Sequence, residues 1–288
     1  MNANPIARWW PAPAKLNLCL HVTGRRADGY HDLQTIFQLI SLSDQLSFDL
    51  REDGRIVRLD YEGSTAQSLR DVAEDQDLCV RAARALQTRS GVTAGVTIRI
   101  RKTIPVGGGL GGGSSDAATT LVALNALWAC GLSTDELAAI GITLGADVPV
   151  FIRGRSGVGE GVGERLTPVE LPNSWFVVIH PGVAVPTRDV FQAPELTRNS
   201  PVLTIPALLA SGGRNDCEPV VRERYPEVAA ALDWLGRYAS ARLTGTGSCL
   251  FARFASAAEA ERVAARVPDV WRAYVVQGLA ESPLLQVL

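Results

Sequence analysis

The sequence predicts an α+β fold built as two lobes, and three observations support this prediction. The chain has 288 residues, whereas an ordinary single domain has ~150. Strand patterns dominate its first part, and strand and helix patterns alternate in its second part. A shift towards Pro, Gly and loop-like residues around 153–163 separates the two parts. We therefore expect one domain at 1–160 and another at 161–288.

The first lobe opens with strand patterns. The stretch Leu16–Val22 alternates leucines with more polar residues, which is the period of a half-buried strand. The pair Asp28-Gly29 indicates a turn after it. Two further strands are expected at 33–42 and 45–50.

Helical patterns and their end signals follow. Apolar spacing predicts a helix at 78–88, and β-branched alternation predicts a strand at 96–104. The next helix, 114–128, is apolar almost all round and is therefore expected to be buried. Ser133 followed by Glu136 forms a capping-box pattern that begins another helix. Glycines at positions 91, 131 and 145 are expected to end the three helices.

The second lobe is predicted to mix strands and helices. Strands are expected at 175–181 and near 272–277, and helices near 226–238 and 257–267. Between them lies a glycine turn, "LTGTGSCLFARF", at 243–254. Its residues Gly245 to Ser248 either brace the glycine-rich loop at 105–115 or only turn the chain between a helix and a strand.

Composition narrows the classes of function. The 28 Lys and Arg residues nearly balance the 30 Asp and Glu residues, so no broad attraction to nucleic acid or to an anionic membrane is expected. No apolar run reaches the ~18 to 20 residues that span a bilayer, and the first residues lack the pattern of a signal peptide. We therefore expect a cytoplasmic protein with neither nucleic acid nor membrane as partner.

The usage of cysteine and lysine is informative. Five widely spaced cysteines without a C-x-x-C pair indicate neither a disulfide framework nor a zinc site. Only Lys15 and Lys102 are lysines, and every other basic residue is arginine. Because lysine offers a compact point charge instead of a planar fork, both are candidate functional cations. Lys102 is a candidate phosphate cation before the glycine loop, and Lys15 is either functional or a solvated residue at a strand end.

A glycine-rich loop precedes the buried helix. A strand, a glycine loop and a helix in this order place free backbone N–H groups and the positive end of a helix dipole around one point. Glycine lets phosphate oxygens approach those amides without a Cβ in the way. The candidate phosphate-binding residues are Pro105, Val106, Gly107, Gly108, Gly109, Leu110, Gly111, Gly112, Gly113, Ser114 and Ser115.

The loop fits a mono- or triphosphate site better than other nucleotide motifs. No lysine follows any of its glycines, so the G-x-x-x-x-G-K-[ST] pattern is absent. The dinucleotide pattern G-x-G-x-x-G can be placed on 107–112, but its acidic partner would be Asp135, which lies at a helix start. The remaining alternative is a glycine connector without a ligand.

Three polar residues begin the helix after the loop. Ser114 and Ser115 fit ordinary N-capping of the helix, and a serine hydroxyl here could also bind phosphate or Mg²⁺, since the two roles are compatible; Ser115 is the candidate Mg²⁺ ligand. Asp116 would repel a bare phosphate. If it faces the site, it should pair with a metal ion or an arginine.

Four motifs together resemble the GHMP kinases, the galactose, homoserine, mevalonate and phosphomevalonate kinase superfamily. They are "PAPAKLNLCLHVTGRRADGYHDLQT", "PVGGGLGGGSSDA", "LGADVPVFIRG" and "LTGTGSCLFARF", in the family's order from Pro11 to Phe254. The resemblance implies an N-terminal ATP-binding domain, a ferredoxin-like C-terminal domain and an active site in the cleft between them. "PAKLNL" with "RADGYH" is similar to the branch that phosphorylates 4-diphosphocytidyl-2-C-methyl-D-erythritol in non-mevalonate isoprenoid biosynthesis.

The resemblance also implies a chemistry for individual residues. ATP with Mg²⁺ would phosphorylate the 2-hydroxyl of the methylerythritol unit, with the loop around the ATP phosphates. Asp147 would orient or deprotonate this hydroxyl, and Lys15 would stabilise the developing charge. From the residues alone, Asp147 fits a structural turn between Gly145 and Pro149 equally well.

For the cytidine end, the resemblance implies rings on both faces of the base. Tyr30 and Phe191 would stack on cytosine and His31 would read its edge, because a base gains ~1 to 3 kcal/mol on an aromatic ring. Taken alone, "RADGYH" fits a packed tyrosine beside a turn and a satisfied surface histidine. Asn17 and Thr187 are further candidates for polar contacts with the substrate, although Asn17 can also be an outward strand residue.

Several alternatives and one departure accompany this hypothesis. The same fold could phosphorylate homoserine or mevalonate, or serve a regulator without catalysis, and an NAD-dependent oxidoreductase is a third alternative. The family usually has Asn-Leu where this chain has Asp77-Leu78, which puts in doubt any adenine or ribose contact carried over to residue 77. The expected assembly is a monomer or a weak homodimer.

Overall fold

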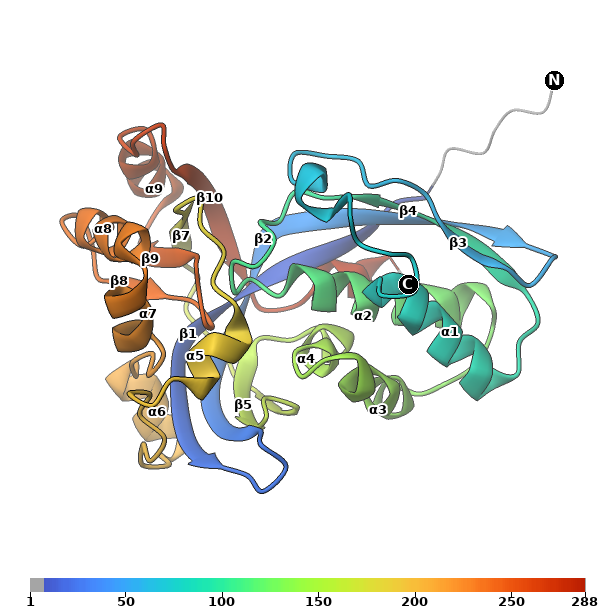
Figure 1. The fold of residues 1–288 in the computed structure, drawn as a ribbon, viewed down its shortest axis with the longest axis horizontal. Helices are drawn as coiled ribbons and strands as arrows, with labels where there is room; N and C mark the ends of the chain where they lie inside the picture. The colour runs from blue at the N-terminus through green and yellow to red at the C-terminus, as the bar shows by residue number, and fades with distance from the viewer. Residues whose placement is uncertain (1–7, 288) are drawn as a thin grey trace.

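The computed structural model describes residues 8–287 (Figure 1). Residues 1–7 and 288 lie outside the described part. The prediction that the first residues are not a signal peptide falls largely on this undescribed stretch. The strands are β1 (Trp10–Arg25), β2 (His31–Arg51), β3 (Ile56–Arg58), β4 (Gly95–Arg101), β5 (Gly157–Gly161), β6 (Arg165–Pro168), β7 (Trp175–His180), β8 (Ala241–Leu243), β9 (Leu250–Phe254) and β10 (Arg272–Leu279).

Helices cover the strands in two groups (Figure 1). The first group packs beneath the N-terminal strands, and the second group lies with β7 to β10 at the other end of the molecule. The helices are α1 (Leu78–Ser90), α2 (Gly112–Leu127), α3 (Thr134–Leu144), α4 (Val148–Arg153), α5 (Thr187–Gln192), α6 (Ile205–Ser211), α7 (Glu218–Arg224), α8 (Pro226–Leu235) and α9 (Ala257–Ala264), with short 3₁₀ turns η1 (Ala66–Leu69) and η2 (Pro283–Gln286).

The strands form a continuous sheet that connects both lobes. Its order is β3-β4-β2-β10-β7-β9-β8, with β1 paired to β2 and the β5–β6 hairpin paired to β2 through β5. The N-terminal core lies between this sheet and α1 to α4, and the C-terminal core lies between β7 to β9 and α7 to α9. The two-lobed α+β prediction is therefore confirmed.

The long strand β2 replaces two expected strands. The sequence predicts separate strands at 33–42 and 45–50, but the residues between them stay extended because Ser43 and Asp44 pair with Pro13 and Ala12 of β1. Strand β1 also begins earlier than expected, at Trp10. Its ladder runs along β2 alone, so prolines at positions 11 and 13 interrupt no second ladder there.

The helix signals in the sequence are largely confirmed. Gly91 ends α1 in the left-handed conformation with φ 73°, and Ser133 and Glu136 form the expected capping box at α3. Helix α2 starts at Gly112, two residues before the expected start, and ends at Leu127. Gly131 does not end α2, because Trp128 is its last cap residue and Ala129 already has a positive φ of 53°.

The stretch around 153–163 holds a strand that the sequence analysis did not predict. Strand β5 pairs with β2 from Leu33↔Gly161 to Phe37↔Gly157, and with β6 on its other side. Because the strand is rich in glycine, its sequence shows no alternation of apolar and polar residues. Glycine is required at Gly159, since a Cβ there would lie 2.5 Å from the ring of Phe37. The division of the chain at 160/161 stays a prediction. Within 8–287, no helix is long and apolar enough to cross a bilayer.

Candidate active site

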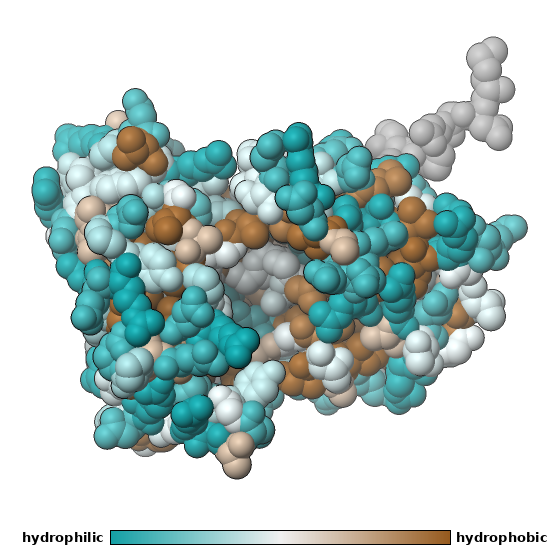
Figure 2. All heavy atoms as spheres, in the orientation of Figure 1, coloured by the Kyte–Doolittle hydropathy of each residue, from teal (hydrophilic) through white to brown (hydrophobic). Residues whose placement is uncertain are grey.

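A cavity of about 540 Å³ opens between the two lobes. Figure 2 shows it as a hollow in the middle of the molecule. Residues of β1 and β2 lie along it, the glycine loop 105–113 and Asp147 come from the first lobe, and Thr187, Phe191 and Thr246 come from the second lobe. The predicted cleft between two lobes is therefore present, and it contains most of the predicted site residues.

The glycine loop is held between β1 and the second glycine turn. The backbone N–H of Lys15 donates to the carbonyl of Leu110 at 3.0 Å, and that of Cys249 donates to the carbonyl of Gly108 at 3.1 Å. At Gly109, with φ 74°, a Cβ would lie 2.2 Å from the carbonyl oxygen of Thr244. The turn at 243–254 thus both reverses the chain and braces the loop.

The start of α2 can receive an anion. Its N-cap is Gly111, with φ 74°, and no side chain caps the helix; no acidic residue lies in its first turn. The capping alternative for Ser114 and Ser115 is therefore wrong. The first N–H groups of a helix without a side-chain cap carry the positive end of the dipole towards the cavity, which favours phosphate.

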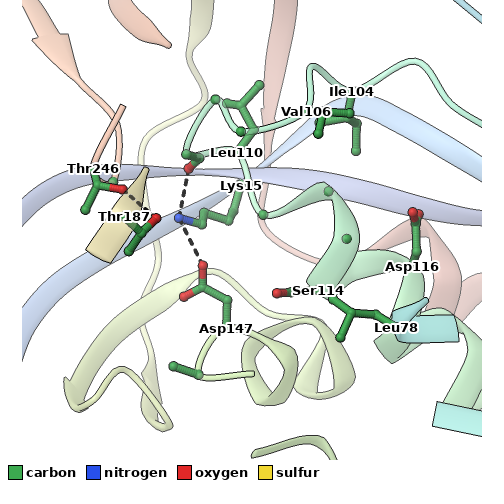
Figure 3. Close-up of a pocket in the computed structure, with 18 of the residues that line it drawn as sticks. Lys15, Leu78, Ile104, Val106, Leu110, Ser114, Asp116, Asp147, Thr187 and Thr246 are labelled. Atoms are coloured by element: carbon green, nitrogen blue, oxygen red, sulfur yellow. Dashed lines mark hydrogen bonds and ion pairs between the residues drawn. The ribbon is translucent and has the colours of Figure 1, made fainter. Parts of the chain in front are cut away.

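The two serines have different surroundings. The hydroxyl of Ser115 is buried and donates to the carbonyl of Pro13 at 2.7 Å, and Ser115 does not line the cavity. Ser114 does line it, and Figure 3 draws its hydroxyl on the side of Asp147. The structure therefore brings Ser114, and not the predicted metal ligand Ser115, to the cavity.

Lys15 and Asp147 meet at the floor of the cavity (Figure 3). The Lys15 ammonium lies 3.3 Å from Asp147 Oδ2, donates to the carbonyl of Gly109 at 3.0 Å and is only 3% exposed. Asp147 occupies the N-cap position of α4, but its side chain makes no capping hydrogen bond. Its carboxylate faces Lys15 and stays 31% exposed, so it is open to a ligand.

Asn17 acts within the protein. Its Oδ1 accepts a hydrogen bond of 2.5 Å from Lys15 Nζ, and its Nδ2 donates to the hydroxyl of Thr35 at 2.8 Å. The hydroxyl of Thr35 donates in turn to the carbonyl of Cys19 at 2.5 Å. This chain of donors fixes the orientation of the Asn17 amide, so Asn17 holds the Lys15 ammonium although it also lines the cavity.

Lys102 has different partners from those expected. Its ammonium lies between Asp44 and Asp116, at 2.5 Å from each, and all three side chains are buried. Burial raises the pKa of Asp116 to about 7 against the opposing effect of Lys102, and the two carboxylates raise the pKa of Lys102. Asp116 therefore pairs with a cation, as expected for an acid near a phosphate site, but this cation is a lysine.

Only some of the residues predicted to bind the cytidine end of the substrate lie at the cavity. Phe191 and Thr187 line the cavity, and the Thr187 hydroxyl lies 2.9 Å from that of Thr246. His31 is buried and stacks on Phe191 with ring centroids 5.1 Å apart. Tyr30 is 62% exposed, and neither Tyr30 nor His31 is among the residues that line the cavity. The assignment of these residues to cytidine stays a prediction.

The opposite end of the cavity contains residues that the sequence analysis missed. Tyr61, Leu69 and Val72 line it, from a polar segment without periodic apolar residues. Asp77 lies beside them, and its carboxylate accepts from the backbone N–H groups of Cys79 and Val80, at the start of α1. It also accepts from the Tyr61 hydroxyl and pairs with the Arg58 guanidinium. The carboxylate of Asp77 is thus bound to groups of the protein itself.

Family models match both lobes of the chain. The model described as GHMP kinases N terminal domain matches residues 77–155, and the model described as GHMP kinases C terminal matches residues 195–273. The first match contains the glycine loop and Asp147, whereas Lys15 lies before it.

Similar proteins cover nearly the whole chain. A 4-diphosphocytidyl-2-C-methyl-D-erythritol kinase of Halorhodospira halophila is 55% identical, over 96% of this chain and 94% of its own. The protein of that name from Pseudomonas paraeruginosa is 54% identical, over 95% of both chains.

Solved structures agree with these matches. A crystal structure of 4-(cytidine 5'-diphospho)-2C-methyl-D-erythritol kinase is 35% identical, with a TM-score of 0.77 over 94% of this chain and 99% of its own. The homoserine kinase of Cytophaga hutchinsonii has a TM-score of 0.66 over 98% of this chain and 97% of its own at 15% identity, which shows a shared fold alone.

Proposed function

The chain belongs to the GHMP kinases, in the family of the 4-diphosphocytidyl-2-C-methyl-D-erythritol kinases, and on this premise we propose the reaction and the role of each site residue. The γ-phosphoryl group of ATP passes to the 2-hydroxyl of 4-diphosphocytidyl-2-C-methyl-D-erythritol, which gives the 2-phosphate and ADP. The proposed residue roles rest on one observation. Lys15 and Asp147 form an ion pair beside the start of α2, where no side chain caps the helix.

The glycine loop and α2 bind the phosphates of ATP. The uncapped N–H groups of the helix and the left-handed glycines of the loop supply donors for phosphate oxygens without moving side chains. The brace from the turn at 243–254 keeps the loop in place while the phosphates bind. Pre-organised donors of this kind are the main contribution of a protein to phosphoryl transfer.

Asp147 and Lys15 act on the acceptor hydroxyl. The exposed part of the Asp147 carboxylate receives or orients the hydroxyl proton, while the hydroxyl oxygen forms a bond to the γ-phosphorus and the bond to the β-phosphate oxygen breaks. Lys15 stabilises negative charge on the acceptor oxygen and the moving phosphoryl group. Its three donor positions are held by Asn17, Gly109 and Asp147, so its ammonium is oriented before substrate binds.

Mg²⁺ accompanies ATP in this proposal and would neutralise charge on the transferring phosphates. In residues 8–287 no group of three or more His, Cys, Asp or Glu side chains is arranged to hold a metal ion. Mg²⁺ commonly keeps several waters and takes only one or two protein oxygens beside the phosphates. The Ser114 hydroxyl and the Asp147 carboxylate are oxygens of this kind at the cavity, so the residues fit the ion.

The same observations argue against the other functions considered for this chain. Membership of the kinase family excludes the NAD-dependent oxidoreductase. A regulator without catalysis would not need an oriented lysine and carboxylate at the phosphate loop.

We also propose a cytoplasmic location, a monomer or weak homodimer, and a domain division at 160/161. Light scattering would test the assembly.

The decisive experiment is ADP release by the purified protein with ATP and Mg²⁺. Acceptors to compare are 4-diphosphocytidyl-2-C-methyl-D-erythritol, methylerythritol 4-phosphate, mevalonate, homoserine and galactose. We expect turnover with the first alone, and its loss in Asp147→Asn but not in the surface control Asp135→Asn, whose carboxylate is 82% exposed. Turnover with another acceptor would overturn the substrate, and ATP binding without any turnover would support the regulator.

A further inference from the structure

A second cavity lies on the other face of the sheet that both lobes share. Its volume is about 470 Å³, and it has no lining residue in common with the active-site cavity. On β2, Thr35 and Phe37 line the active-site cavity, whereas Ile36 and Gln38 line the second cavity. Neighbouring side chains of a strand point to opposite faces, so β2 separates the two cavities. A molecule in the second cavity would therefore lie outside the cleft of the proposed reaction.

Two aromatic rings form an apolar surface in this second cavity. Phe176 of β7 and Phe251 of β9 meet edge to face with ring centroids 5.9 Å apart, and they are 1% and 4% exposed. Further apolar side chains come from β1, β2, the segment before β7 and α6, namely Leu18, Ile36, Leu171 and Leu209. A cavity of this size, with a mainly apolar lining and a few polar groups, has the usual form of a small-molecule site.

The guanidinium of Arg242 is oriented at this cavity by the backbone. The ladder of β1 with β2 is irregular between Asn17 and Cys19, and Leu18 has no partner in it. Nη1 of Arg242 donates to the carbonyl of Leu18 at 3.1 Å and to that of Gly212 at the end of α6. Within residues 8–287, Nε and Nη2 have no hydrogen-bond partner, and neither atom is enclosed by protein. This free edge matches two oxygens of a carboxylate or phosphate.

The charges around the cavity favour an anion. Arg253 of β9 is a second arginine in the lining, and its side chain is exposed. Neither Arg242 nor Arg253 forms an ion pair with a carboxylate of the described residues. Glu170 is the single acidic residue of the lining, so two guanidinium groups are opposed by one carboxylate. One positive charge is left for a ligand.

Gln38 adds an acceptor from inside the sheet. Its side chain is 3% exposed, and its Nε2 donates to the carbonyls of Leu39 at 3.0 Å and Leu279 at 2.8 Å. Its Oε1 receives no hydrogen bond from residues 8–287, although Gln38 lines the cavity. A buried acceptor without a donor is unfavourable, so an amide N–H or hydroxyl of a ligand would satisfy it.

We propose that this cavity is a second ligand site, which binds a small amphipathic anion. The apolar body of the ligand packs on Phe176 and Phe251, and its carboxylate or phosphate binds the free edge of Arg242. Burial of the apolar body supplies most of the affinity, and the charge-assisted hydrogen bonds select the anion over a neutral analogue. The inference goes beyond the proposed function and does not depend on it.

The first test is calorimetric titration of the purified chain with probes that differ in charge. N-octanoylglycine supplies a carboxylate and an amide N–H, octyl phosphate supplies a phosphate, and N-octanoylglycinamide is the neutral reference. We expect one anion to bind at a single site at least about tenfold more tightly than the neutral amide. The tighter of the two anions identifies the charged group. Absence of binding by both anions, or binding no tighter than that of the neutral amide, would overturn the proposal.

The second test changes the charges of the cavity one at a time. We expect the better anion to bind about 10- to 100-fold more weakly to Arg242→Met, because its charge-assisted partner is lost. Arg253→Met should weaken binding about two- to fivefold, and Glu170→Gln should strengthen it by a similar factor. Arg262→Met, an exposed arginine outside the lining, should leave the affinity unchanged. If Arg242→Met does not fold, unchanged affinity in both Arg253→Met and Glu170→Gln would overturn the proposal, as would unchanged affinity in folded Arg242→Met.

The third test separates the second cavity from the active-site cavity. The titration is repeated with Mg²⁺ and a non-hydrolysable ATP analogue, which occupies the glycine loop in the proposed reaction. We expect the anion to bind with the same affinity, because its site lies on the other face of the sheet. Displacement of the anion by the nucleotide would place it in the cleft and overturn the proposal. None of these titrations requires turnover, so a failure of the proposed function would leave the result of the first two unaffected.

Discussion

The two lysines of the chain have the same exposure and opposite surroundings. Lys15 and Lys102 are each 3% exposed, and both line the cavity between the lobes. Lys102 is enclosed by two buried carboxylates, whereas Lys15 has one carboxylate that is 31% exposed and two neutral oxygens. Burial and residue type therefore do not distinguish a structural lysine from a functional one; the partners do.

The partners determine how much charge is left for a ligand. Around Lys102, two carboxylates meet one ammonium, so its charge is fully compensated inside the protein. Around Lys15, the neutral oxygens of Asn17 and Gly109 orient the ammonium without cancelling its charge, and the remaining compensation comes from Asp147. The charge of Lys15 is therefore available to a phosphoryl group in the proposed reaction, and that of Lys102, directly after β4, links β2 to α2.

The largest effect is expected when Lys102 is removed. Lys102→Met would leave Asp44 and Asp116 buried without their cation, and breaking a buried ion pair in this way costs ~3 to 5 kcal/mol. We expect the free energy of unfolding to fall by about this amount, measured by urea denaturation. A variant as stable as the wild type would contradict the stabilising role of Lys102 and, with it, the contrast with Lys15.

Removal of Lys15 should affect catalysis instead of stability. Lys15→Met is expected to lower kcat about 10²- to 10³-fold, as for the loss of one transition-state donor. Asp147 remains solvated in this variant, so the free energy of unfolding should change by less than about 1 kcal/mol. Steady-state kinetics and denaturation of the same sample would check both. A large loss of stability with normal kcat would mean that Lys15 stabilises the fold and does not act in catalysis.

A smaller effect is expected from the donor chain that orients Lys15. Thr35→Val keeps the shape of the side chain but leaves the Asn17 amide without its acceptor, so kcat should fall about tenfold. Thr35→Ser should restore it. Thr120→Val is the matched control, because its hydroxyl is equally buried and donates to the carbonyl of Asp116 within α2. Equal kcat in Thr35→Val and Thr120→Val would show that the chain does not orient Lys15.

The last prediction concerns the pH dependence of stability that arises from Asp116, beside Lys102. The folded-state pKa of Asp116, about 7, lies above its ordinary value, so its contribution to stability is complete at low pH and is lost as the pH rises towards 7. Asp116→Asn should therefore become more stable relative to the wild type between about pH 4 and pH 7. Asp135→Asn should show no such trend. Denaturation curves at several pH values would measure the difference, and a constant difference would contradict the raised pKa.

The sequence predicted the glycine loop and the elements on either side of it better than the contacts that surround them. The glycines, the strand before them and the buried helix after them lie close together in the chain, so their pattern is local and readable. The partners of Lys102 are not local: Asp44 lies 58 residues away and is brought in by the pairing of β2 with β4. The expectation that Asp116 needs a cation followed from charge alone, but its partner depended on this pairing.

Short elements and glycine strands were missed for a different reason. Helices α5 and α7 have six and seven residues, fewer than two turns, so neither shows a helical period in the sequence. Strand β5 is mostly glycine and shows no alternation. Arg198, which holds His31 and Phe191, lies in a loop after α5, and no spacing in the sequence relates it to His31.

Strand β2 has a mechanical consequence for the cleft. It is 21 residues long, pairs with β1 over most of its length, and joins β4 and β5 of the first lobe to β10, which continues to β7 of the second. The ladder between β2 and β10 that links the lobes has only two residue pairs, Gly278↔Ile40 and Leu279↔Leu39. One side of the cleft is therefore a sheet shared by both lobes, whereas its walls include residues from the segments 59–76 and 181–204, which contribute no strand to that sheet.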